Sequence, residues 1–115
     1  MLEKLKKNKD IINIKEGDKL IEIECDKNNI LSVLKKLKEN NDFVFDQLLD
    51  ITAVDNPSRE HRFDLIYIVQ SLKKNKKLIL KTPLKENDSI ETITSVHKAA
   101  DWYERECYDL FGIEF

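Results

Sequence analysis

The amino-acid sequence predicts an α+β fold, a two-layer sandwich in which a mainly antiparallel sheet carries its helices on one face. Two stretches repeat apolar residues with the 3.6-residue period of a helix, and several others alternate as half-buried strands do. The strands in the second half of the chain follow one another through short polar turns, which favours antiparallel pairing. At 115 residues, the chain is predicted to form one domain, residues 1–115, with residues 1–10 as a loose N-terminal segment.

The first half of the chain is predicted to hold one strand between two helices. Residues 2–8 favour a short, weak helix. The stretch KLIEIEC, residues 19–25, alternates and predicts a strand. Asp26 is placed to cap a helix over residues 26–40, and Asn40 with Asn41 is expected to end it in the left-handed conformation. The apolar stripe of this helix is Ile30, Val33, Leu34 and Leu37.

The second half is predicted to form extended segments over residues 43–54, 62–72 and 77–83. The middle one alternates most clearly, and a polar KKNK turn joins it to the last one, which Pro83 closes. A loop then leads into a helix from His97 to Phe111, and Gly112 is its stop.

The composition excludes several kinds of site. A net charge of −2 gives no electrostatic footprint for nucleic acid. Two glycines cannot build a phosphate-binding loop, and two cysteines cannot hold an iron–sulfur cluster, which takes about four thiolates. His61 and His97 have no partner at metal-ligand spacing and are interpreted as ordinary surface or loop histidines. We therefore expect no catalytic residue, no metal and no cofactor in this chain.

Cysteine usage and hydropathy indicate where the protein works. Cys25 and Cys107 lie far apart in the sequence, so no disulfide framework is expected and a reducing cytoplasm is the default. No apolar run approaches the ~20 residues that a membrane span needs. Any attachment to a membrane is therefore expected to come from another protein.

The C-terminal helix carries more aromatic residues than a helix that only completes a core. Trp102 and Tyr108 lie off its apolar stripe, and Phe115 follows the stop. Large aromatic residues mixed with arginine outside a core face are typical of protein–protein contacts. We therefore expect a second polypeptide to cover this region, the alternative being a segment of the same chain. The stripe itself is predicted to face the sheet and consists of Val96, Ala99, Ala100, Tyr103, Cys107, Leu110 and Phe111.

Three carboxylates of this helix are assigned to the same contact. Glu104 and Glu106 point about 200° apart, so they cannot flank one substrate, and they are interpreted as solvated or partner-bound charge. Asp109 stands in the last turn, where the helix dipole disfavours a negative charge by up to ~1 kcal/mol. Arg105 is placed to offset that charge.

The run ADWYERECYDLFGIEF, residues 100–115, resembles the W-Y-E-R-E-x-Y-D-x-F-G-I-x-F run of the complex I 30 kDa subunit family, which belongs to NADH–quinone oxidoreductase and its relatives. The stretches DITAVDNP, HRFDLIYIVQSL and KKLILKTPL precede it in the order and spacing of that family. The resemblance covers about residues 20–115.

The resemblance implies a two-layer α+β subunit that is not an enzyme on its own and has no cofactor. It would lie in the peripheral arm of a respiratory electron-transport complex, on the cytoplasmic face of the membrane. The implied partners are the large catalytic subunit, of the type shared by the 49 kDa subunit of complex I and nickel–iron hydrogenases, and neighbouring iron–sulfur subunits. The residues expected to bind the large subunit are Trp102, Glu104, Arg105, Glu106, Tyr108, Asp109, Phe111, Gly112, Ile113 and Phe115.

The sequence departs from the family pattern at its end. Members from respiratory complexes continue past this run with a His-Pro segment and an Arg-rich stretch, whereas the sequence here ends at Phe115. A shortened respiratory subunit and the short form found in energy-converting hydrogenases both remain open. The electron donor and acceptor remain open with them.

Two other classes of function are weighed against this one. A free-standing α+β module that binds RNA or protein fits the fold, but the net negative charge and the lack of strand aromatics interleaved with basic residues argue against RNA. A small hydrolase using Glu or His would need a nucleophile–base pair, and the sequence shows none.

Overall fold

The structure, a computed structural model, describes residues 2–115. A 3₁₀ turn at Lys27–Asn29 precedes α2. The helices and strands follow in the order α1 (Leu2–Lys6), β1 (Ile11–Glu16), β2 (Leu20–Cys25), α2 (Ile30–Glu39), β3 (Gln47–Asp55), β4 (Phe63–Ser71), β5 (Lys76–Leu84) and α3 (Ala100–Phe111).

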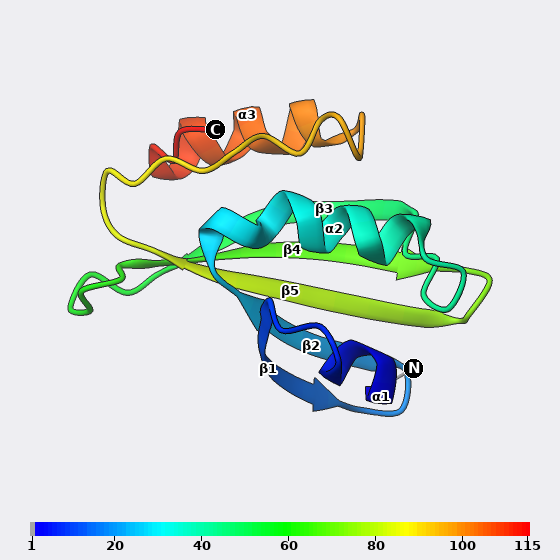
Figure 1. The fold of residues 1–115 in the computed structure, drawn as a ribbon. Helices are drawn as coiled ribbons and strands as arrows, with labels where there is room; N and C mark the ends of the chain where they lie inside the picture. Colours follow the sequence, from blue (N-terminus) through cyan, green and yellow to red (C-terminus); the bar gives the residue numbers. More distant parts are fainter. Residues whose placement is uncertain (1) are drawn as a thin grey trace.

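The five strands form one mixed sheet in the order β1-β2-β5-β4-β3. β2 runs parallel to β5, with Leu20 opposite Lys77, while the pairs β1–β2, β4–β5 and β3–β4 are antiparallel. Both long helices lie over the same face of the sheet (Figure 1). The predicted two-layer α+β fold with a mainly antiparallel sheet is therefore confirmed.

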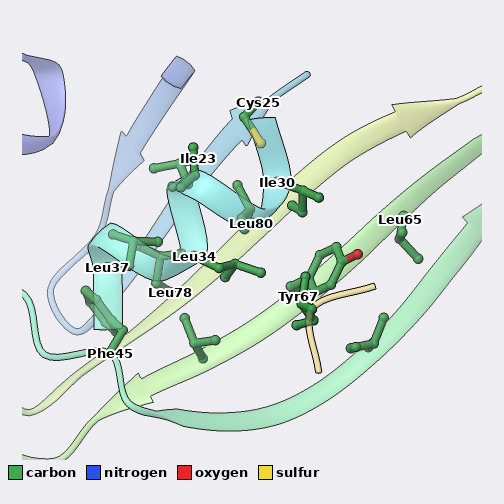
Figure 2. Close-up of a cluster of buried hydrophobic side chains, with 14 of the residues drawn as sticks. Ile23, Cys25, Ile30, Leu34, Leu37, Phe45, Leu65, Tyr67, Leu78 and Leu80 are labelled. Atoms are coloured by element: carbon green, nitrogen blue, oxygen red, sulfur yellow. The ribbon is translucent and has the colours of Figure 1, made fainter. Parts of the chain in front are cut away.

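The core lies between this face and the helices. The predicted stripe of α2 is buried in full, and it meets alternate residues of β2, β4 and β5 (Figure 2). The strand prediction for 62–72 is also confirmed in its faces, because the β4 residues that point to the helices are buried while Ile66 and Ile68 on the open face are half-buried. The buried residues of β4 are Phe63, Leu65, Tyr67, Val69 and Ser71.

The N-terminal region holds the short helix that was predicted over residues 2–8, observed as α1. Residues 2–10 were also expected to be loose, but Leu5 of α1 is only 1% exposed and packs into the core. β1 was not predicted at all. It pairs with β2 through a tight turn in which the Gly17 N–H donates to the Leu20 carbonyl at 2.8 Å.

The two ends of α2 differ in how well they were predicted. The Asp26 carboxylate accepts a hydrogen bond from the Asn28 N–H at 2.9 Å, so Asp26 is confirmed as a cap. It caps the 3₁₀ turn that precedes α2 and not α2 itself. At the other end, Asn40 is extended, and the left-handed residue is Val44 with φ 52°. This prediction was wrong because the buried rings of Phe43 and Phe45, on either side of Val44, fix the path of the chain.

Two further boundaries are shifted. β5 runs one residue beyond Pro83, because Leu84 is buried and holds the strand on the core. α3 begins at Ala100 and not at His97, because a separate turn comes first, in which the N–H groups of Val96 and His97 both donate to the Ile93 carbonyl. No helix within residues 2–115 is long and apolar enough to cross a membrane.

Candidate docking face on helix α3

The inner side of α3 packs on the sheet, but it is rotated relative to the prediction. Ala100 and Cys107 are buried, and Tyr103 and Phe111 are half-buried, as the predicted stripe requires. Ala99 and Leu110 are exposed, so their assignment to the stripe was wrong. Val96 is buried but precedes the helix. The inner side is centred on the line from Ala100 through Glu104 to Cys107 and Phe111.

Glu104 occupies the middle of this inner side. It is 7% exposed, its Oε1 accepts a hydrogen bond from the Thr92 hydroxyl at 2.6 Å, and its Oε2 accepts one from the Ile93 N–H at 2.9 Å. The interpretation of Glu104 as solvated or partner-bound charge was therefore wrong. Burial of a carboxylate is tolerated here because both oxygens have donors. Glu104 ties α3 to the loop that leads into it.

Cys107 lies on the same side and is confirmed as a buried thiol. Its Sγ donates to the Ile51 carbonyl of the edge strand β3 at 3.2 Å. Burial, with Asp50 adding to it, raises the pKa of this thiol to about 12. Burial likewise raises the pKa of Cys25 to about 12. Both thiols are buried and protonated near neutral pH, which disfavours a role as nucleophile, and within residues 2–115 neither belongs to a group of side chains that could hold a metal ion.

The outer side of α3 exposes large side chains. Trp102 is 69% exposed, Tyr108 55% and Leu110 69%. Trp102 and Tyr108 were predicted to lie off the buried stripe, and this is confirmed. We call the residues Trp102, Arg105, Glu106, Tyr108, Asp109 and Leu110 the α3 outer face.

The charged residues of the α3 outer face are only partly paired within the chain. Arg105 contacts Asp101 at 3.2 Å, one turn earlier, as an exposed ion pair. Within residues 2–115, Glu106 and Asp109 have no ion-pair partner. Arg105 therefore pairs with Asp101 and does not offset Asp109 as the sequence suggested.

The residues after the helix are held by this chain itself. Gly112 adopts the left-handed conformation with φ 73°, as predicted for the helix stop. Ile113 is 3% exposed, so the expectation that another polypeptide must cover it was wrong. The segment is fixed where the Ile90 N–H donates to the Glu114 carbonyl at 3.0 Å. Phe115 remains half-buried.

Phe111 and an arginine that sequence reasoning missed line a hollow of about 310 Å³ at the end of α3. The Phe111 ring meets Phe63 edge-on, with centroids 6.2 Å apart. Arg62 lies over the Phe63 ring and donates to both carboxylate oxygens of Asp55 at 2.8 and 2.9 Å. This bidentate contact holds the pKa of Asp55 below its usual value. Arg62 and Phe63 are neighbours in the sequence, but Asp55 comes close to them only because β3 and β4 pair as an antiparallel hairpin.

His97 was predicted to be an ordinary surface or loop histidine, and it lies in the loop before α3 but is buried there, whereas His61 is exposed. His97 is 4% exposed, and its Nε2 meets no hydrogen-bond partner in the described chain. It borders a hollow of about 670 Å³ that Asp46 and Ser95 also line. These are residue types of a hydrolase, but no hydrogen bond within residues 2–115 joins them, so the nucleophile–base pairing of such an enzyme is not formed.

Burial, together with the nearby Lys38 charge and against the weaker pull of Asp46, lowers the pKa of His97. The folded state therefore binds a proton here less readily than the unfolded chain. The contribution of neutral His97 to the free energy of unfolding is complete above the unfolded pKa of about 6.5. It is lost as the pH falls through the lower pKa of the folded state. We expect the free energy of unfolding, measured in urea, to fall between pH 7.5 and pH 5 by less in His97→Gln than in the wild type.

The matched control for this pH dependence is His61→Gln, because His61 is exposed. The same substitution there removes an imidazole from the surface without touching the residues around His97. Equal slopes for His97→Gln and the wild type would show that His97 titrates normally in the folded protein.

The family of this chain is shown by its similarity to known proteins. Residues 23–115 match the model of the respiratory-chain NADH dehydrogenase 30 Kd subunit. The chain belongs to this family. The match covers β3, β4, β5 and α3, and therefore includes the whole α3 outer face.

Relatives in the 30 kDa subunit family are similar over most of the chain. An NADH-quinone oxidoreductase subunit from Rickettsia bellii (strain RML369-C) is 41% identical over 104 residues, which are 90% of this chain and 52% of that protein. Its counterpart from Caulobacter sp. (strain K31) is 43% identical over 88 residues, 76% of this chain and 41% of that protein. The chain thus spans about half the length of these relatives.

A solved structure shares the fold of this 30 kDa-family chain. In the membrane-bound sulfane sulfur reductase, an archaeal respiratory membrane complex, one chain superimposes with a TM-score of 0.85 and 28% identity. The superposition covers 99% of this chain and 66% of that one. The similarity therefore extends over the N-terminal hairpin as well as the family-matched part.

Proposed function

We propose that this protein is a non-catalytic peripheral-arm subunit of a membrane-associated respiratory redox complex, which docks on the large catalytic subunit and stabilises it. The complex is of the NADH:quinone oxidoreductase type or of the energy-converting nickel–iron hydrogenase type. The protein holds no cofactor of its own and is attached to the cytoplasmic face of the membrane through the complex. Family membership and the NADH-quinone oxidoreductase relatives support this proposal.

The observation that carries the docking role is the exposure of Trp102, Tyr108 and Leu110 on one helix. Tryptophan, tyrosine and arginine dominate the binding energy of protein interfaces, and the α3 outer face has all three. The inner side of the same helix is fixed by the hydrogen bonds of Glu104 and Cys107. A helix held in this way presents its outer residues with little loss of freedom on binding.

The open face of the sheet offers no comparable support for RNA binding. Its centre is formed by Ile66, Ile68 and Ile79, and in the described strands no aromatic side chain points to that side. Recognition of single-stranded RNA on a sheet relies on stacking of bases on aromatic rings. The docking role is therefore the function that the geometry favours.

The test is co-purification of a tagged chain with the large subunit from cells that make the complex. We expect Trp102→Ala to weaken retention by about 10- to 30-fold, as for a central interface tryptophan, and Arg105→Ala to weaken it measurably. Both side chains are exposed, so the melting temperature of the isolated chain is expected to change by no more than about 2 °C.

Leu72→Ala is the control, because Leu72 is a large residue of similar exposure, 65%, on the distant β4–β5 turn. It is expected to leave retention unchanged. A parallel loss of retention and melting temperature in Arg105→Ala would mean that Arg105 serves only the fold.

A further inference from the structure

The α3 outer face belongs to an acidic segment on a chain that is otherwise slightly basic. Residues 100–115 contain five carboxylate side chains and one arginine, while the whole chain has 22 acidic residues and 20 Lys and Arg. The remaining residues therefore have a surplus of basic side chains. Of the five carboxylates only Glu104 is buried. The negative charge is thus concentrated on the side of α3 that faces away from the sheet.

Two of these carboxylates are placed unfavourably for the isolated chain. Asp109 stands in the last turn of α3, which contains no basic residue, so its charge meets the negative end of the helix dipole. Glu106 lies one turn earlier, also without an ion pair in the described chain. Moreover, no backbone N–H of residues 2–115 donates to the carbonyls of Asp109, Leu110 or Phe111. A cation brought to this end of the helix would relieve all of these interactions together.

The apolar members of the face flank this negative charge. Trp102 and Leu110 are eight residues apart, which separates them by about 12 Å along the helix axis. Glu106 lies between them on the same side, because residues four apart are neighbours on a helix. The face therefore has two carboxylates without an ion pair in the described chain between two exposed apolar side chains, while the charge of Arg105 is paired with Asp101.

From this arrangement we infer that the surface docking on α3 is a basic patch of the large subunit. It places Lys or Arg side chains against Glu106, Asp109 and the last carbonyls of α3, and it has apolar recesses for Trp102 and Leu110. The inference rests on the proposed docking function and adds the chemistry of the partner surface. Complementary charge of this kind fixes orientation and speeds association more than it adds affinity. A nucleic acid or an anionic membrane would be repelled by the same face.

The experiment compares retention of the large subunit by tagged variants of the full chain, washed with NaCl from about 50 to 500 mM, a range over which exposed charges become largely screened. We expect wild-type retention to fall as salt rises. The double variant Glu106→Lys with Asp109→Lys is expected to lose at least about tenfold in retention at the lowest salt, because like charges then face each other. Glu106→Gln with Asp109→Asn should lose less and show a weaker salt dependence.

Two controls separate docking from folding. Glu16→Lys with Asp18→Lys makes the same change of charge at exposed positions, one at the end of β1 and one in the turn after it. This turn lies far from α3 (Figure 1), so the variant should retain the large subunit as the wild type does. The isolated Glu106→Lys, Asp109→Lys variant should melt at the wild-type temperature or slightly above it, since a cation in the last turn suits the helix dipole.

The outcomes distinguish the inference from the proposed function. Wild-type retention that persists at high salt and survives the double lysine variant overturns the basic partner surface but leaves the docking role intact. Tighter retention of the double lysine variant overturns it as well. Absence of the large subunit at every salt concentration overturns both. Self-association of the wild type that the double lysine variant abolishes would assign the face to a second copy of this chain and overturn the inferred partner.

Discussion

Replacing Glu104 by alanine is expected to lower the free energy of unfolding by about 2–4 kcal/mol. The substitution removes a buried carboxylate that accepts hydrogen bonds from the Thr92 hydroxyl and the Ile93 N–H. The Ile93 N–H stays buried beneath α3, and an unsatisfied buried donor is costly, whereas Thr92 is exposed and its hydroxyl can turn to water. The change also leaves a cavity between α3 and the loop. Urea unfolding at neutral pH measures the loss.

Two variants on the same helix test this explanation. Glu104→Gln keeps one acceptor oxygen, so it is expected to lose about half as much as Glu104→Ala. Glu106→Ala removes an identical side chain from the exposed face and should change the free energy of unfolding by no more than about 0.5 kcal/mol. If the alanine variants at 104 and 106 unfolded at the same urea concentration, the buried carboxylate would not be a structural support.

Leu34→Ala is expected to lower the free energy of unfolding by about 2–5 kcal/mol, the range for a leucine removed from a closely packed core. Leu34 is 0% exposed and lies at the centre of the apolar stripe of α2, between the helix and the sheet (Figure 2). Its loss removes buried apolar contacts and leaves a cavity that the surrounding strands cannot fill without moving. The change is measured by thermal or urea unfolding.

The control for this core substitution is Leu72→Ala, which makes the same chemical change at an exposed turn. It should alter the free energy of unfolding by about 0.5 kcal/mol at most. A similar loss in both variants would point to an effect on the unfolded chain instead of on core packing.

Much of the fold could be predicted because periodicity reports which side chains are buried. The two-residue period of β4 and the 3.6-residue period of α2 each identified the buried side correctly. β1 was missed because Ile11, Ile12 and Ile14 do not alternate. A bulge between Ile11 and Asn13 shifts the register there. The Gly-Asp pair of the following turn was a hairpin signal that could have revealed the strand.

The pairing of β2 with β5 could not be read from local pattern. Sequential strands tend to be neighbours, and this tendency holds for β3, β4 and β5. The parallel neighbour of β2 is instead set by α2, which carries the chain over the sheet to β3 and leaves the edge of β5 free. Such long-range choices depend on packing of the whole domain.

The candidate site was predicted in part. Exposure of Trp102 and Tyr108 followed from their angle on the helix, since both lie away from Ala100, Cys107 and Phe111. Glu104 was misjudged because a carboxylate was assumed to seek water. Its position four residues after Ala100 and three before Cys107 already placed it in the buried stripe. Only the loop donors, which no helical pattern can reveal, explain why it is tolerated there.

The parallel contact between β2 and β5 also dictates the order in which the chain can complete its sheet during synthesis. The hairpin of β1 and β2 leaves the ribosome before β3, β4 and β5, but Leu20 finds its neighbour only when Lys77 has been made. Until then Ile21 and Ile23 lack their neighbours on β5, and one edge of the hairpin stays open to other nascent chains. The antiparallel strands β3 to β5 can assemble by local contacts. The hairpin of β1 and β2, although it is made before the other strands, is therefore the last part of the sheet to gain all of its neighbours.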